Sequence, residues 1–272
     1  MDILFDIGGT NIRIAGAKNA SSFLAPKIFK TPKIFKEVVD LIVSEAKKIA
    51  GLDKITSVIG AVSGSIDKSG IVLKSRNLKQ LEHKPFARNI SRRLRAKVLL
   101  VNDAVMAGLG ECSFGAGKSS KICAYITIST GIGGARFTGG EVDKYNLSFE
   151  PGKQLIKELN GKFLSWEDLA SGKAIQDKFN VLPSNVKDKK FWEKEAKIVA
   201  VGLYNTIMHW TPDTLVLGGG IILTTPLSIQ LTEKELKKIN SGYAHKLPKI
   251  KKARLGDFGG LWGGLAWLKL SK

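Results

Sequence analysis

The sequence predicts an α/β protein of two similar lobes with a cleft between them, because one order of elements occurs twice along its 272 residues. Each half begins with a strand, a Gly-rich turn and a second strand, and continues as helix, strand, helix, strand and helix. The Gly-rich turns "DIGGTN" and "STGIGG" fall at equivalent places, as do "AVSG" and "LGGG" at strand ends. Because ligands of α/β proteins bind where strands end, these repeated motifs indicate a binding site in the cleft.

The first half predicts its elements through apolar periodicity. Alternation predicts a hairpin over 2–17, followed by a short extended segment near 26–30. A helix is expected from about Pro32 to Ala50, capped by Thr31, with apolar residues at 35, 38, 42, 46 and 49 on one face. We then expect a strand over 55–62, a basic helix near 86–95, a strand over 97–101 and a helix opened by residues 102–104.

The second half repeats this plan with an irregular insertion. A strand, turn and strand are expected over 122–137, then a long helix near 190–209 and a strand over 213–220. A further helix, a short strand over 249–255 and a Gly-rich helix over 257–270 complete it. We place the first lobe at residues 1–110, completed by the C-terminal segment 257–272, and the second lobe at 111–256. The P-loop-like "GAGKSS" (115–120) lacks that motif's first Gly and its strand-to-helix context, so we interpret it as a connecting loop.

The composition indicates a soluble protein with an unusual charge. Lys and Arg outnumber Asp and Glu by 43 to 24, and a net charge of +19 favours polyanionic partners. The charge is widely spread, and Arg88, Arg92 and Arg95 recur at a helical spacing that is typical of a solvated face. We find no membrane span and no secretory leader, and expect a cytoplasmic protein. With two Cys, the chain has neither a disulfide framework nor a Cys-rich zinc cluster.

The motifs at the strand ends suit phosphate chemistry, although each also has a plain structural interpretation. Gly-rich turns expose backbone N–H groups to phosphate oxygens, and the hydroxyls of Thr10 and Thr130 add donors; a simple hairpin turn fits the same residues. Asp6 suits a phosphate site if Mg²⁺, usually through water, lies between them. Residues 217–220 leave a bare surface for adenine or ribose, or a close helix–strand contact. Asp103 follows Asn102 either as part of a helix cap or as a base for a hydroxyl attacking a γ-phosphate.

Five ordered motifs together resemble one family. "FDIGGTN", "VNDAVMAGLGE", "ISTGIGGA", "WEDLASGKAI" and "TPDTLVLGGGI" are similar to the motifs of the ROK sugar kinases and their relatives, which belong to the actin-like (ribonuclease H-like) superfamily. The resemblance covers nearly the whole chain, and five motifs in order are far more specific than any one. It implies two actin-like lobes, Mg-ATP and a sugar in the cleft, and transfer of the γ-phosphoryl group to a hexose hydroxyl.

The resemblance also implies roles for individual residues. Asp103 matches the catalytic base, and Asp6 the acid near the metal. The phosphate-binding positions are Gly8, Gly9, Thr10, Thr130, Gly131 and Gly133, and the adenosine loop is Gly218, Gly219 and Gly220. The sugar contacts are Gly64, Asn77, Asn102, Asp103, Glu150 and Glu167.

The sequence departs from the family in the second lobe. Lys153 stands where the family's E-x-G-H motif has its histidine, and "QLIKELNGKFLS" replaces the Cys-rich zinc loop. We therefore expect no zinc, and expect Lys153 to face the sugar or to pair with Glu150 or Glu167. Packing would instead hold the segment, for which the candidates are Leu155, Leu159, Phe163 and Trp166. Ser129 also replaces a usual Gly in the second phosphate turn.

These observations predict an ATP- and Mg²⁺-dependent hexose kinase, with the 6-hydroxyl of glucose as the first acceptor. Mannose, fructose or an N-acetylhexosamine as acceptor, and polyphosphate as donor, remain open because the sugar pocket departs from the family and the charge is high. A sugar-responsive, DNA-binding regulator is disfavoured, since the first turn begins at Asp6 and leaves no room for a helix-turn-helix ahead of it. We expect no specific nucleic-acid partner and no membrane; the sequence leaves open whether the protein forms a homodimer.

Overall fold

The computed structural model describes residues 1–143, 148–240, 242 and 246–271. The chain divides into two compact units: unit 1 comprises Met1–Phe114 and Leu255–Lys272, and unit 2 comprises Gly115–Arg254. Each unit contains a five-stranded sheet with helices, so the expected α/β class with two similar lobes is confirmed.

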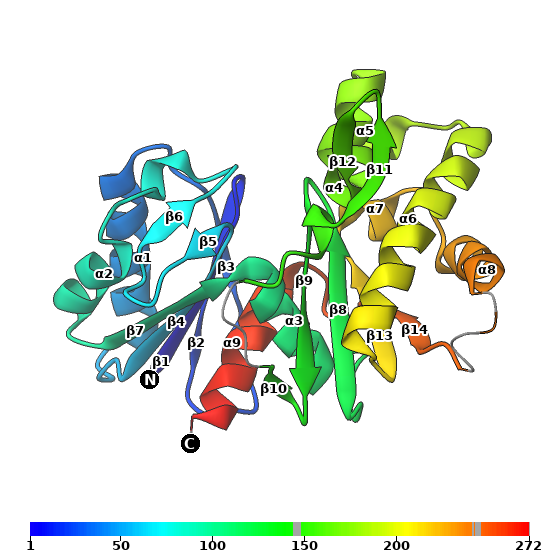
Figure 1. Ribbon diagram of the computed structural model, residues 1–272. Coiled ribbons are helices and arrows are strands. Elements are labelled where there is room, and N and C mark those ends of the chain that lie inside the picture. Colours follow the sequence, from blue (N-terminus) through cyan, green and yellow to red (C-terminus); the bar gives the residue numbers. More distant parts are fainter. Residues whose placement is uncertain (144–147, 241, 243–245, 272) are drawn as a thin grey trace. The chain divides into compact units, whose positions relative to one another are not determined.

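The sheet of unit 1 has the strand order β3-β2-β1-β4-β7 (Figure 1). Its strands are β1 (Asp2–Ile7), β2 (Asn11–Ala17), β3 (Lys27–Lys30), β4 (Ser57–Val62) and β7 (Lys97–Asn102). β1, β4 and β7 are parallel, and the register pairs Ile7 with Val62 and Val62 with Asn102. The carboxyl ends of these three strands therefore lie side by side, and the segments that follow them meet at one edge of the sheet.

Helices cover both faces of this sheet. On one face, α1 (Phe35–Ala50) and α2 (Phe86–Leu94) share a core with Phe5, Ile42 and Phe86. On the other, α9 (Gly259–Leu270) packs over Leu4 and against α3 (Asp103–Ser113). A Cβ at Gly263 would overlap the carbonyl oxygen of Met106, so glycine allows the two helices this close approach. The smaller elements are β5 (Ser65–Ile66), β6 (Val72–Lys74), η1 (Lys79–Leu81) and η4 (Gly256–Phe258).

One predicted helix start is wrong. α1 begins at Phe35 after Ile34, whose side chain makes no capping hydrogen bond, instead of at Pro32 with Thr31 as its cap. The Thr31 hydroxyl instead donates to the carbonyl of Gly8 at 2.7 Å, and its backbone N–H to that of Thr10 at 2.9 Å. A long-range contact with the first Gly-rich turn has therefore replaced the local cap.

Unit 2 repeats the topology with the order β10-β9-β8-β13-β14. Its strands are β8 (Ile122–Ile128), β9 (Ile132–Thr138), β10 (Glu141–Val142), β13 (Thr214–Gly218) and β14 (Lys249–Lys252). The long α6 (Lys189–Trp210) packs against α8 (Ile229–Ile239), and both contribute to one core with β8 and β13. The remaining elements are η2 (Pro151–Lys153), β11 (Leu155–Leu159), β12 (Lys162–Ser165), α4 (Trp166–Ala170), α5 (Gly172–Phe179), η3 (Pro183–Asn185) and α7 (Gly220–Thr224).

The packing expected for the segment that replaces the zinc loop is wrong for three of its four residues. The segment forms the hairpin β11–β12, in which Leu155, Leu159 and Phe163 are 64%, 49% and 65% exposed. Trp166, by contrast, is completely buried at the start of α4, where Gly202 of α6 lies against its ring. The segment is thus attached to unit 2 by Trp166, by Ile156, which packs against the core of unit 2, and by the Gln154 amide, which donates to the Thr206 hydroxyl at 2.8 Å.

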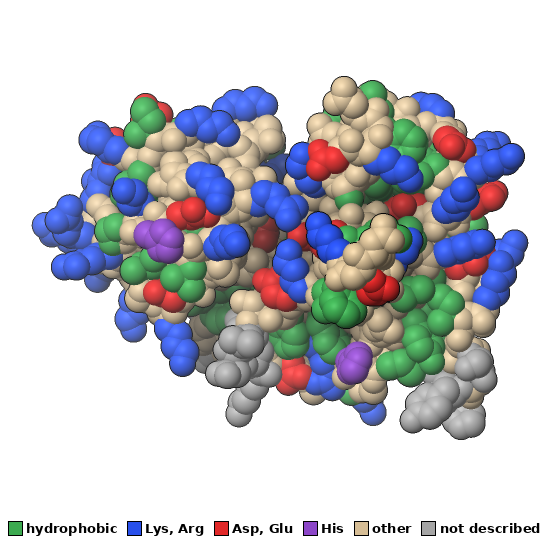
Figure 2. Space-filling view, turned by 45° about the horizontal axis from the view of Figure 1, so that its top comes forward, with side chains coloured by type: hydrophobic (Ala, Val, Ile, Leu, Met, Phe, Trp, Pro, Cys, Tyr) green, Lys and Arg blue, Asp and Glu red, His purple; other side chains and the backbone are tan. Residues whose placement is uncertain are grey.

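The basic residues are spread over the surface. Figure 2 shows Lys and Arg side chains scattered over the visible face of both units. Arg88, Arg92 and Arg95 are exposed, in agreement with a solvated face of α2. Among the helices that the structure describes, none combines the length and the apolar character required to cross a membrane.

Candidate active site

The first Gly-rich turn, residues 8–10, joins β1 to β2. Gly8 donates its backbone N–H to the Asn11 carbonyl at 3.0 Å, and Thr31 holds the turn from β3's side through the contacts given above. A Cβ at Gly9 would lie 2.7 Å from Cβ of Asn77, so Asn77 packs directly over the bare backbone. Two of the predicted site positions, Gly9 and Asn77, are thereby brought into contact.

Asp6 is the last but one residue of β1 and is partly buried. Burial, followed by the nearby charge of Asp103, raises the pKa of Asp6 to about 7, while Arg13 opposes this shift. The backbone of α9 lies directly against it, because a Cβ at Gly260 would be 2.7 Å from Cγ of Asp6. Asp6 and Asp103 are therefore close enough for their charges to interact, and Arg13 supplies the opposing positive charge.

Asp103 is the first residue of α3, directly after β7. Burial raises its pKa, and hydrogen bonds from the Ala104 backbone and the Ser63 hydroxyl partly offset the effect. The cap of α3 is Asn102, whose side-chain oxygen accepts from the N–H groups of Ala104 and Val105 at 2.9 and 3.1 Å. Asn102 therefore supplies the cap, and Oδ1 of Asp103 also accepts from the Ala104 N–H, at 3.0 Å.

The loop after β4 completes this edge of unit 1. The Asn102 amide donates to the Gly64 carbonyl at 3.0 Å, which ties the ends of β4 and β7 together. Gly64 has φ +132°, and a Cβ there would lie 2.5 Å from the Lys74 carbonyl, so the position requires glycine. Asp6, Gly64, Asn102 and Asp103 therefore follow or end three adjacent strands, as the sequence predicts.

The second Gly-rich turn joins β8 to β9 in unit 2. Ser129 donates its N–H to the Gly131 carbonyl at 2.8 Å, and accepts from the Gly172 N–H at 2.7 Å. The Lys173 N–H donates to the Thr130 carbonyl at 3.2 Å. The amino end of α5 thus packs against this turn, and Ser129 is accommodated without a glycine.

The triple glycine ends β13 and begins α7. Gly218 pairs with Thr127 in the parallel register, and a Cβ at Gly219, where φ is +88°, would overlap the carbonyl of Ile128. Gly220 has open space around it. Residues at the end of α7, at the start of α8 and in β14 line a cavity of about 450 Å³: Ile222, Thr225, Leu227, Ser228, Ile229, Gln230, Ile250 and Lys252. Gly218, Gly219 and Gly220 therefore lie at the same sheet edge as the second turn.

The acidic residues of the second lobe have different surroundings. Glu167, in α4, accepts from the Ile132 N–H at 2.9 Å and from the Lys153 ammonium at 2.8 Å. Glu150, which precedes η2, is exposed, and its carbonyl accepts from the Lys153 N–H at 3.0 Å. The expectation that Lys153 pairs with an acid of this segment is confirmed for Glu167.

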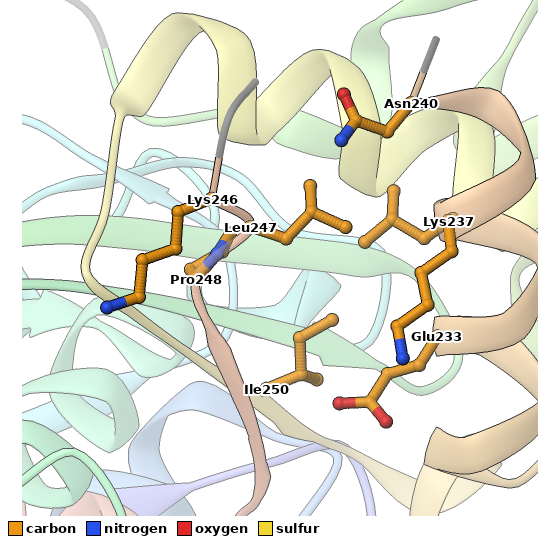
Figure 3. Close-up of a pocket in the computed structure, with 8 residues that line it drawn as sticks. Glu233, Lys237, Asn240, Lys246, Leu247, Pro248 and Ile250 are labelled. Atoms are coloured by element: carbon orange, nitrogen blue, oxygen red, sulfur yellow. The ribbon is translucent and has the colours of Figure 1, made fainter. Parts of the chain in front are cut away.

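A second cavity, of about 390 Å³, lies between α8 and β14 (Figure 3). Glu233 and Lys237 of α8 and Ile250 of β14 contribute to its wall. No predicted site residue lines this cavity.

Sequence reasoning missed four contributors to these surroundings: Arg13, Ser63, Gly260 and Gly172. Arg13 lies opposite Asp6 in the β1–β2 register and forms an ion pair with Asp257 at 3.5 Å. The pairing of Arg13 with Asp6 could have been predicted from the hairpin, since the two residues are equally distant from the turn on either strand. Gly260 contacts Asp6 and Gly172 contacts Ser129, residues that are distant in the sequence, so no local sequence pattern predicts these contacts.

Metal ligands are not clustered in the part of the chain that the structure describes. There, no group of three or more His, Cys, Asp or Glu residues could hold a metal ion.

The repeated topology, with a Gly-rich turn at the carboxyl edge of each sheet, defines the actin-like class of α/β proteins. The chain belongs to the ROK family, whose model matches residues 3–271. The family resemblance carried by the five motifs is thus confirmed.

Individual relatives span almost the whole chain at low identity. An N-acetyl-D-glucosamine kinase of Mannheimia succiniciproducens is 25% identical, with 96% of this chain and 97% of that protein covered. The crystal structure of a ROK hexokinase from Thermus thermophilus has a TM-score of 0.85 at 24% identity, covering 99% of this chain and 98% of that one. A ROK family glucokinase from Streptomyces griseus, in complex with glucose and AMPPNP, has a TM-score of 0.78 at 23% identity, covering 99% of both chains. These solved structures confirm the fold.

Proposed function

We propose that this protein is a cytoplasmic sugar kinase that transfers the γ-phosphoryl group of ATP to a hexose hydroxyl, with the 6-hydroxyl of glucose as the first candidate. The observation that carries this proposal is Asp103, a desolvated carboxylate at the start of α3 that is not needed as the helix cap. The family membership and the sugar-kinase names of full-length relatives support the same reaction class.

Asp103 would act as the general base. As the sugar hydroxyl oxygen attacks the γ-phosphorus, the bond from this phosphorus to the β,γ-bridging oxygen breaks, and Asp103 accepts the hydroxyl proton. The products are ADP and the sugar phosphate. Burial suits this role, because a carboxylate with a raised pKa is a stronger base than a solvated one.

Sugar hydroxyls would be bound by polar side chains and backbone groups. Asn102 and Gly64, linked to each other beside Asp103, and Asn77 over the first turn are the proposed contacts from unit 1. Glu150 and Glu167 are those from unit 2. Each buried hydroxyl needs a hydrogen-bonding partner, and a set of amide and carboxylate groups suits a polyol.

The phosphates would be held at the two Gly-rich turns, where the backbone carries no side chains; the Gly8 N–H already donates to the Asn11 carbonyl, so Gly8 would contribute close approach of the backbone and not a donor. The proposed contacts are Gly8, Gly9 and Thr10 in the first turn, and Thr130, Gly131 and Gly133 in the second. The hydrogen bonds that fix both turns support this, since a preorganised turn loses little conformational entropy when an anion binds.

The acid pair fits a requirement for Mg²⁺. Asp6 has a pKa of about 7 because it is buried beside Asp103, and a bound cation would favour its ionised form. Asp6 would hold Mg²⁺ through water. When bound with ATP, Mg²⁺ neutralises charge that develops on the phosphate oxygens.

ATP is our preferred donor over polyphosphate. Gly218, Gly219 and Gly220 would form the adenosine loop; the open space around Gly220 supports this, and polyphosphate has no adenosine to place there. The net charge of +19 is the observation in favour of polyphosphate, so both donors belong in the test.

The test is a kinase assay on the purified protein with glucose, mannose, fructose and N-acetylglucosamine, each with Mg-ATP and with polyphosphate. We expect phosphorylation of at least one hexose, with kcat/KM higher for ATP than for polyphosphate at matched ionic strength. A preference for polyphosphate would overturn the donor assignment. Failure to phosphorylate any sugar with either donor would overturn the proposed function.

A further inference from the structure

We propose that the outer edge of β14 binds a protein partner, which adds an extended acidic segment to the sheet of unit 2 as one further strand. β14 contains none of the predicted site residues, so this inference is independent of the proposed kinase reaction. Strand addition of this kind takes its affinity from backbone hydrogen bonds and its specificity from pockets that receive alternate side chains. The edge of β14 has both features.

The backbone of β14 presents hydrogen-bonding groups at its outer edge. β14 is last in the order β10-β9-β8-β13-β14, so β13 is its only neighbour among the strands that the structure describes. The N–H groups of Lys249 and Ala253 donate towards β13, at 3.0 and 2.8 Å. Because successive N–H groups along a strand point to opposite sides, those of Ile250 and Lys252 point away from β13. These two residues therefore offer their backbone groups to an added strand.

Two cavities lie on either side of Ile250 along this edge, and residues of α8 complete the wall of both. One cavity, of about 390 Å³, includes Pro248 and Ile250 in its wall (Figure 3). The other, of about 450 Å³, includes Ile250 and Lys252. Side chains two residues apart in a strand share a face and are separated by about 7 Å. Two alternate side chains of an added strand would therefore enter one cavity each.

The floors of the two cavities are apolar. Leu236, which is completely buried, and Leu247, which packs against the core of unit 2, contribute to the first. Leu227, which is 1% exposed, contributes to the second. Short aliphatic side chains suit such floors, because their transfer from water into contact with buried apolar atoms is favourable.

The rim of the cavities is basic. The charged residues that line them are three exposed lysines and one glutamate: Lys237, Lys246, Lys252 and Glu233. Lys249, on the other face of β14, is exposed as well. Opposite charges on paired strands are favourable and like charges are unfavourable. This edge therefore selects an acidic strand and disfavours pairing with the same edge of a second copy of this chain.

The probe is the peptide Glu-Glu-Val-Glu-Val-Glu-Glu, labelled with fluorescein through a flexible linker. In an extended strand its two valines share one face with the two terminal glutamates. The valines would enter the cavities while the terminal glutamates meet the lysines of the rim. A control peptide of the same composition has its valines at adjacent positions, which places them on opposite faces.

Binding to the full-length protein is measured by fluorescence anisotropy. We expect saturable binding of the probe by wild type and much weaker binding of the control peptide. Lys252→Glu should weaken binding of the probe by at least about 5-fold, because it replaces an attraction with a repulsion. Lys190→Glu, at an exposed position in α6, makes the same change in net charge away from this edge and should leave the affinity within about 2-fold.

Lys252→Pro and Lys252→Met separate the backbone contribution from the charge. Both variants lose the ammonium group, but only proline also removes the outward N–H. Proline is tolerated at the edge of a sheet where the N–H faces away from the neighbouring strand. We expect Lys252→Pro to bind the probe roughly 3–10-fold more weakly than Lys252→Met, with a similar thermal midpoint.

Four outcomes would overturn the proposal. They are the absence of saturable binding below about 1 mM, equal binding of the two peptides, equal affinities of Lys252→Pro and Lys252→Met, and equal losses in Lys252→Glu and Lys190→Glu. Displacement of the probe by oligothymidylate at a lower concentration than by unlabelled peptide would assign the edge to a nucleic acid instead. If Lys252→Pro does not fold, the two peptides and Lys252→Glu decide. None of these measurements uses kinase activity, so failure of this proposal is distinguishable from failure of the proposed function.

Discussion

Glu195 provides a test of the electrostatics of unit 2 that is independent of catalysis. It lies on α6, is 3% exposed, and its Oε1 is without a hydrogen-bond partner among the described residues. Burial raises the pKa of Glu195 to about 7, with Lys178 opposing the shift. We predict that Glu195→Gln stabilises the protein at alkaline pH and has little effect at acid pH.

The magnitude follows from linkage between protonation and folding. The usual pKa of Glu is 4.5, and the folded-state value is about 7. Below 4.5 both states hold the proton, so stability is unaffected; between 4.5 and about 7 the unfolded state loses it first, and stability falls as pH rises. At about 1.36 kcal/mol for each pKa unit, the ionised side chain costs roughly 3 kcal/mol above neutrality.

Urea unfolding at pH 5 and pH 8, followed by tryptophan fluorescence, measures this effect. We expect Glu195→Gln to raise the free energy of unfolding by roughly 2–3 kcal/mol at pH 8 and by less than about 1 kcal/mol at pH 5. Glu193→Gln, at an exposed position of the same helix, is the matched control and should change little at either pH. A stabilisation by Glu195→Gln that is equal at both pH values would refute the assignment of the cost to buried charge.

The remaining predictions concern the candidate active site. Asp103→Asn should keep sugar binding, measured by calorimetry, and lose about 10²–10⁴-fold in kcat, the usual contribution of a general base; a near-parental rate would leave Asp103 a structural residue. Because burial raises the pKa of Asp103, wild-type kcat/KM should fall as pH decreases towards that value, and a pH–rate profile that stays flat through the acid range would contradict the role. Gly260→Ala should lower kcat/KM by at least about 10-fold, because its Cβ would lie 2.7 Å from Cγ of Asp6. The control Gly259→Ala should be tolerated, because its Cβ would meet only ordinary contacts from 3.5 Å. Equal kcat/KM for the two variants would count against the Asp6 contact. Metal analysis of the purified protein should find no zinc, since residues 150–172 contain neither Cys nor His; stoichiometric zinc whose removal abolishes activity would show otherwise.

The sequence could predict which residues lie at the ends of strands, because apolar periodicity gives the strand boundaries and parallel pairing brings those ends to one edge of the sheet. Asp6 and Asp103 each stand where an apolar run stops, and parallel pairing of β1, β4 and β7 brings such positions to one edge. The repeat of this order in unit 2 predicts the same for Gly218 beside the turn at Thr130. The position of these residues does not define their function, and their catalytic and binding roles stay predictions.

Identical local sequence does not always give identical structure. The pentapeptide "PKIFK" occurs at 26–30 and again at 32–36. In the first copy it forms β3, paired with β2 through Ile12 and Phe29, while in the second its last two residues begin α1. Pairing with β2 selects the extended state for the first copy, and the apolar face of α1 selects the helix for the second. The start of α1 was misplaced because Thr31 makes its hydrogen bonds to the turn at Gly8, a partner that no window of neighbouring residues contains.

In the hairpin β11–β12, the apolar composition of the sequence led to a wrong prediction of burial. Leu155, Leu159 and Phe163 have the apolar character of core residues, yet all three are exposed, because a two-stranded hairpin has no second layer of its own to cover them. The residues at the two ends of this segment make the specific contacts. Lys153, before the hairpin, donates to Glu167, which also accepts from the Ile132 N–H of β9; Trp166, after the hairpin, is completely buried. A search of the sequence for apolar residues therefore selects the middle of the segment, whereas the ion-paired Lys153 and the buried Trp166 lie at its ends.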